Sequence, residues 1–162
     1  MTASSYTTAQ IQGMSTATIV TLGTGIFQGF TSTQVGALTA TQVAAITTAE
    51  VNALTTTNIP GLTTAAITAL SSVQVAALNS DGVDGLGSAQ VQALSAVGVA
   101  GLSTVEVSTQ IGSLKASQVA SITTAAIAAL TSSADGSLSS AQVAALTTAQ
   151  LAHLIHRIAG IR

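Results

Sequence analysis

Hydrophobic side chains recur along this chain with a fixed period of eight residues. From Thr7 onward each octad approximates Thr-Thr-Ala-Gln-Val-Ala-Ala-Leu, with Val or Ile at octad position 5 and mostly Leu or Ile at octad position 8. Twelve octads run in unbroken phase to Leu102, an irregular twelve-residue unit occupies 103–114, and octads then resume to the end. Such self-similarity is typical of a solenoid. We therefore predict an N-terminal extension over 1–6 and one octad-repeat solenoid over 7–162.

The polar positions of the octad predict where helices begin. Position 1 is usually Ser or Thr and position 4 is often Gln or Glu, which together form a capping box. The flanking apolar residues at position 8 and position 5 are the two places that a hydrophobic staple uses. Each octad therefore predicts one helix of about six residues. The predicted helix-capping residues are Thr31, Thr39, Thr47, Thr63, Ser71, Ser139 and Thr147.

Helices this short are unstable alone, so octads must stack and share a core. The predicted core residues are Val35, Leu38, Val43, Ile46, Val51, Leu54, Val75, Leu78, Val91, Leu94, Val119, Ile122, Val143 and Leu146. Small residues at positions 6 and 7, among them Gly13, Gly61 and Gly101, are expected to let neighbouring backbones approach closely. Two octads per turn would give a rod of roughly 80 Å, but the pattern leaves handedness and octads per turn open.

The octad pattern predicts an all-α solenoid of very short helices, and two other architectures, one continuous helix and a β-solenoid, compare with it as follows. In one continuous helix eight residues advance about 800°, so the apolar stripe would spiral around the whole cylinder. A β-solenoid remains the alternative, because Thr and Val favour strands, although Ala and Gln do not. The capping box favours helices.

Departures from the consensus predict local irregularities. Pro60 removes a hydrogen bond within its unit, and Asp135 occupies an expected core position. The unit at 103–114 is expected to appear as a bulge or a change of direction. Apolar residues near the C-terminus recur at helical spacing and predict a longer, divergent helix over about 148–162 that closes the core.

Composition excludes several functional classes. Only 5% of the residues are charged, three basic and five acidic, which is too few for the basic face that binds nucleic acid. The chain has no Cys, which excludes disulfides, thiolate zinc sites and a thiol nucleophile. Every apolar run is interrupted well before the roughly 18 residues of a membrane span. We predict no enzyme, no cofactor and no catalytic residue, because no nucleophile has a base and an orienting partner.

Two segments are weak candidates for metal binding. His153 and His156 are three residues apart, so a helix could place them on one face. No carboxylate or thiol lies near them in the sequence, and the polar face of the terminal helix explains them better. The segment Asn79–Asp84 distantly resembles a calcium loop, but it lacks the spacing and the bidentate Glu of an EF-hand. Turn formation explains it better.

Two features suggest function. Ser and Thr at positions 1 and 2 would repeat at even spacing along one edge, and regular Thr arrays on an uncharged Ala-rich rod resemble those of ice-binding proteins. The second feature is that apolar residues are already in register in the first octad, at Ile11 and Met14, so this end has no polar cap. An unsealed end favours head-to-tail stacking of copies into a filament.

The octads themselves resemble a known class of repeat. TATQVAAI at 39–46, SSAQVAAL at 139–146 and TTAQLAHL at 147–154 are similar to the Thr/Ala-rich short repeats of large bacterial surface or secreted proteins of the adhesin-like type. The resemblance implies an extracellular or cell-surface role, here without a recognisable cleaved signal peptide. Our leading hypothesis is a structural protein whose partner is itself, as a filament, or that acts as a surface adhesin or spacer. The alternative is ice binding.

Overall fold

The computed structural model describes residues 2–130 and 137–159, which form a succession of very short helices without a strand. The all-α prediction is therefore confirmed over this part of the chain, and the β-solenoid is excluded there. The elements are η1 (Ala3–Ser5), α1 (Thr8–Gly13), α2 (Thr16–Val20), α3 (Thr24–Gly29), α4 (Ser32–Gly36), α5 (Ala40–Ala45), α6 (Thr48–Asn52), η2 (Ile59–Gly61), α7 (Thr64–Thr68), α8 (Ser72–Ala77), α9 (Asn79–Asp84), α10 (Ser88–Val91), α11 (Ala96–Val99), α12 (Thr104–Gln110), η3 (Ile111–Ser113), α13 (Ala116–Val119), α14 (Thr124–Ala128), α16 (Ser140–Ala144) and α17 (Thr148–Ala159).

Most of the described helices begin directly after the Ser or Thr that opens the octad, although α3, α10 and α13 follow Gly23, Gly87 and Lys115. In α4 the side chain of Thr31 accepts a hydrogen bond from the N–H of Gln34 at 3.2 Å, and the Gln34 side chain accepts one from the N–H of Thr31 at 2.9 Å. This reciprocal pair satisfies two of the N–H groups that a helix start leaves without partners. All seven residues predicted as caps accept such a bond: Thr31, Thr39, Thr47, Thr63, Ser71, Ser139 and Thr147.

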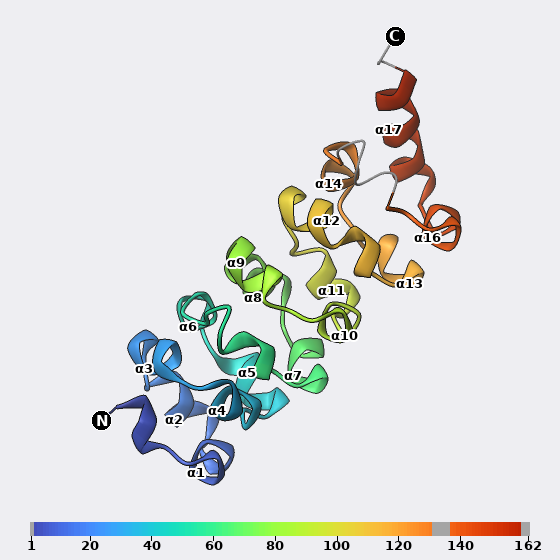
Figure 1. Cartoon of the computed structure of the whole chain (residues 1–162). Coiled ribbons are helices and arrows are strands. Elements are labelled where there is room, and N and C mark those ends of the chain that lie inside the picture. The colour runs from blue at the N-terminus through green and yellow to red at the C-terminus, as the bar shows by residue number, and fades with distance from the viewer. Residues whose placement is uncertain (1, 131–136, 160–162) are drawn as a thin grey trace.

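The chain winds with three octads in each turn. Helices whose first residues are 24 apart pack on one another, as α2 from Thr16 packs on α5 from Ala40 and α3 from Thr24 packs on α6 from Thr48. Since 24 residues are three octads, the number of octads per turn that the sequence left open is three, and not the two assumed for the length of the rod. One side of the solenoid, which we call the first stack, consists of α1, α4, η2, α9, α12, α14 and α17. The described chain forms an elongated rod with its two ends far apart (Figure 1).

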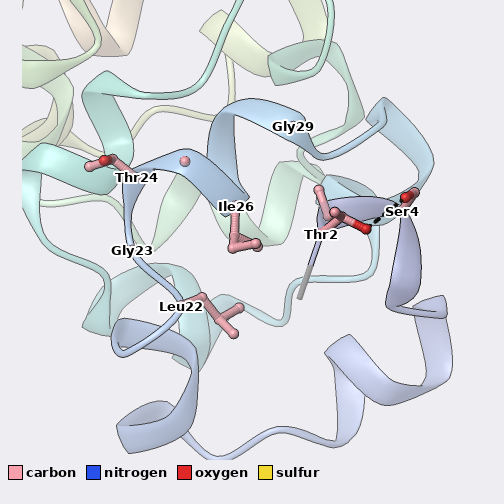
Figure 2. Close-up of a pocket in the computed structure, with 9 residues that line it drawn as sticks. Thr2, Ser4, Leu22, Gly23, Thr24, Ile26 and Gly29 are labelled. Carbon is pink, nitrogen blue, oxygen red and sulfur yellow. Dashed lines mark hydrogen bonds between the residues drawn. The ribbon is translucent and has the colours of Figure 1, made fainter.

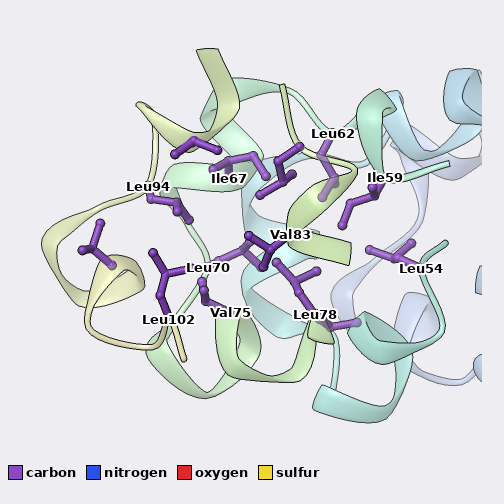
Figure 3. Packing of buried hydrophobic residues seen from close by; sticks show 14 of the residues in the cluster. Leu54, Ile59, Leu62, Ile67, Leu70, Val75, Leu78, Val83, Leu94 and Leu102 are labelled. Carbon is purple, nitrogen blue, oxygen red and sulfur yellow. The ribbon is translucent and has the colours of Figure 1, made fainter. Parts of the chain in front are cut away.

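Octad positions 5 and 8 fill a thin continuous core along the rod. Figure 3 shows these side chains, among them Ile67, Val75 and Leu78, converging between the short helices. Burying one such side chain stabilises the fold by about 1.5–3 kcal/mol. Twelve of the fourteen predicted core residues are buried, the exceptions being Val143 and Leu146 in and after α16.

Glycines at octad position 7 let successive turns touch. A Cβ on Gly61 would lie 1.9 Å from the carbonyl oxygen of Ser32, and one on Gly101 would lie 2.2 Å from that of Ser72. Both pairs are separated by 29 residues, so each is the same kind of contact between one turn and the turn before it. Gly13, which has no turn beneath it among the described residues, shows no such contact.

The structure also resolves the other irregularities. The unit that contains Pro60 retains only the three-residue helix η2, as expected from the missing N–H donor. Residues 79–84 form the short helix α9 and not the predicted turn or a calcium loop. Asp135 lies outside the described residues.

Candidate functional site: an amide ladder with two open ends

Glutamine side chains connect each turn of the rod to the preceding turn. Gln42 caps its own helix through Oε1, which accepts from the N–H of Thr39 at 2.8 Å. Its Nε2 meanwhile donates to the carbonyls of Ile11 at 2.7 Å and Met14 at 2.8 Å, 31 and 28 residues earlier. Those carbonyls lie at the junction between two octads, which we call a corner. One buried amide group therefore accepts a hydrogen bond from the N–H at the start of its own helix and donates hydrogen bonds to the carbonyls of a corner in the preceding turn.

We call the series of these bonds the amide ladder. Its side chains are at most 8% exposed, and each Nε2 donates to two corner carbonyls of the preceding turn. Its members are Gln34, Gln42, Gln74, Gln90, Gln118, Gln142 and Gln150. Because a buried polar atom is costly when it lacks a partner, this complete pairing explains how a chain with so few charges holds polar side chains in its interior.

Three other buried polar residues occupy the glutamine position. Asn58 is one methylene shorter, and its Nδ2 reaches the Phe27 carbonyl at 3.0 Å. Glu50 and Glu106 are buried and accept from the N–H groups of Thr47 and Ser103 at 2.8 and 2.7 Å. A carboxylate has no N–H to donate to a corner. These two glutamates therefore preserve the cap and interrupt the ladder.

The irregular unit at 103–114 consists of two octads that overlap by four residues. Val107 takes position 5 of the first octad, in α12, while Ile111 and Leu114 take positions 5 and 8 of the second, in η3 and after it; all three are buried. Beyond this unit, Gln118 reaches Val91 and Leu94 over 27 and 24 residues, four fewer than the usual separations. The ladder therefore continues across the unit, and the irregularity, expected as a bulge or a change of direction, takes the form of a turn shortened by four residues.

The N-terminal end of the rod exposes Gln10, a glutamine at the same octad position as the members of the ladder, whose Nε2 has no described acceptor. Gln10 caps α1 through Oε1 at 2.8 Å from the N–H of Thr7, but its side chain is exposed and its Nε2 has no partner among the described residues. Residues 3–6, expected to precede the repeat, act as the second half of an octad, because the carbonyls of Ala3 and Tyr6 accept from Gln34.

An open groove of about 750 Å³ lies at this end (Figure 2). Leu22 and Ile26 provide apolar surface, Thr2 and Ser4 provide hydroxyls, and no ionisable side chain lines it. Gly23 in its wall has a φ of +78°, a left-handed conformation that explains why glycine replaces the usual Ser or Thr cap.

The C-terminal end of the rod leaves core positions uncovered. Val143 is 43% exposed at octad position 5, where Val119 in the preceding turn is fully buried. α17 is the longer terminal helix that was expected, and it packs on α14 and contributes Leu154 to the core. Leu151 and Ile155 on the same helix are 38% and 57% exposed, so the described part of α17 covers the core incompletely. No described residue donates a side-chain hydrogen bond to the carbonyls of Val143 and Leu146.

The weak metal candidates remain unsupported. His153 and His156 both lie exposed on α17, and the described residues contain no group of three metal-ligating side chains. Sequence comparison adds no assignment, since no family model, curated protein or solved structure matches the chain. Within the described ranges no helix is long and apolar enough to cross a membrane.

Proposed function

We propose that this chain is a structural, non-enzymatic repeat protein that associates end to end with copies of itself. The observation that supports this most directly is Val143, a core position that is 43% exposed because no further turn covers α16 among the described residues. A second copy would supply the missing turn. Burying the open positions in this way removes apolar surface from water, the main driving force of association.

The two ends differ in chemistry, which favours head-to-tail contact. The N-terminal end offers a free amide and the groove at Leu22 and Ile26, whereas the C-terminal end offers Val143, Leu151 and corner carbonyls. Unlike surfaces make a heterologous contact, which generates filaments when it does not close into a ring.

We place this rod outside the cell, as a spacer or adhesive filament. That location rests on the resemblance of its octads to the repeats of large bacterial surface and secreted proteins. An exposed surface of Ser, Thr and Ala with few charges suits a passive spacer.

Sedimentation velocity over a wide range of concentrations, with electron microscopy of the same samples, tests this proposal. We expect particles that lengthen with concentration. Val143→Glu should suppress the association, because it places a charge on the open end. Val73→Glu is the matched control, since Val73 is 63% exposed on the side of the rod. Monodisperse monomers at every concentration would refute end-to-end assembly.

Ice binding is a second candidate, supported by the first stack. Its octads have an exposed hydroxyl at position 2 that makes no described hydrogen bond, in Thr8, Ser32, Thr56, Thr104, Thr124 and Thr148. The position 1 hydroxyls are largely occupied by capping. Outside the first stack, position 2 is interrupted by Ala40, Ala96 and Ala116, so the described hydroxyls of the first stack form the more regular line. Thermal hysteresis and ice-crystal shaping would test the candidate, with Thr104→Lys compared against Ala96→Lys outside this stack. Round crystals grown in the presence of the wild-type protein would eliminate it.

A further inference from the structure

We infer that the joint between two copies continues the amide ladder, with Nε2 of Gln10 in one copy donating to the carbonyls of Val143 and Leu146 in the copy before it. This inference rests on the proposed end-to-end association and specifies its register. Gln10 is the one capping-box glutamine of the described chain whose amide has no acceptor. The carbonyls of the corner after α16 receive no side-chain donor among the described residues, as also holds for the corners opposite Glu50 and Glu106.

The position of Gln10 in the winding selects this corner. Gln34 in α4 donates to the corner after η1, and Gln150 in α17 donates to the corner after α13, at the carbonyls of Val119 and Ile122. Gln10 occupies the same place in α1 that these two occupy in α4 and α17. The helix that packs on α13 one turn later is α16, so its corner is the next acceptor of this kind.

The two groups are complementary in partial charge. An amide N–H is positive and a carbonyl oxygen is negative, and every described bond of the ladder runs from a later turn to an earlier one. If the copies met in another rotation, the Gln10 amide would be buried without an acceptor, which is costly. The pairing therefore fixes both the direction and the rotation of one copy on the next.

Gln10→Glu removes the amide donor and leaves the helix cap intact. Glu50 shows that a carboxylate supports the same cap, accepting from the N–H of Thr47 at 2.8 Å. Gln12→Glu is the matched control, because it adds the same charge two residues away at an exposed side chain that makes no described hydrogen bond. Circular dichroism of each variant verifies that the helices are retained.

Association constants from sedimentation velocity give the readout. We expect Gln10→Glu to weaken association at least about tenfold and Gln12→Glu to change it less than about twofold. Equal association of wild type and Gln10→Glu, or equal weakening by both variants, would overturn the ladder joint and leave end-to-end assembly standing. A wild type that does not associate would overturn both.

Discussion

The Nε2 of Gln118 donates to the carbonyl of Leu94 at 2.8 Å, although 24 residues separate them where 28 separate the equivalent pair elsewhere. The four residues lost in the overlapping octads between them leave this bond intact. The ladder bond to a corner of the preceding turn therefore forms even where the turn is four residues shorter.

The ladder predicts that the same Gln→Glu substitution lowers the free energy of unfolding at one site and leaves it nearly unchanged at another. Gln42→Glu should lower the free energy of unfolding by about 1–3 kcal/mol, because two buried carbonyls lose their donor. Gln10→Glu should change it by less than about 0.5 kcal/mol in the monomer, since that amide has no partner to lose. Urea unfolding at low protein concentration measures both. Equal decreases in the free energy of unfolding at the two sites would show that the helix cap, and not the ladder, stabilises the fold.

The reverse substitution should stabilise the chain. Glu50→Gln restores an N–H donor opposite the corner carbonyls of Ile19 and Leu22, which lie 31 and 28 residues earlier. We expect a gain of about 0.5–1.5 kcal/mol for each hydrogen bond formed, seen as a higher urea midpoint. Glu106→Gln should behave in the same way. A lower midpoint in both variants would contradict the role assigned to the ladder.

The contribution of an N-cap to stability can be tested by removing the hydroxyl of the capping residue and, separately, that of the residue next to it. Thr147→Ala should cost about 1 kcal/mol, because the Thr147 side chain accepts from the N–H of Gln150 at 3.2 Å. Thr148→Ala removes an exposed hydroxyl without a described partner and should change stability by less than about 0.5 kcal/mol. Thermal unfolding distinguishes them. Similar shifts in melting temperature would argue against capping.

Position along the rod should decide the cost of removing an identical core side chain. Leu78 is fully buried, so Leu78→Ala should cost about 2–5 kcal/mol. Leu146 has the same place in its octad but is only half-buried at the open end. Leu146→Ala should therefore cost clearly less when measured in the monomer. Equal costs would mean that the end of the rod is covered in solution.

The features visible in the sequence are those that depend on residues three to five positions apart. The cap at Thr31 and Gln34 and the core residue Val35 are both encoded within one octad, so pattern and spacing predict them. Val143 has the same octad context as Val119, but no described turn covers it and it is 43% exposed. Local pattern cannot distinguish an interior turn from an end.

The ladder and the three-octad turn depend on contacts between residues 24 to 31 apart. One signal for the ladder was nevertheless present. A capping box needs only an acceptor at position 4, which Glu supplies as well as Gln. The preponderance of glutamine over Glu50 and Glu106 indicates that the donor half of the amide is also used.

The direction of the ladder bonds has a mechanical consequence. Each bond joins successive turns, so a pulling force on the two ends loads these bonds in series, and the weakest turn opens first. One released turn of 24 residues lengthens the chain to about 80 Å at full extension. Under tension, a rod of this kind would therefore unfold and lengthen turn by turn. Its turns would refold when the force is removed.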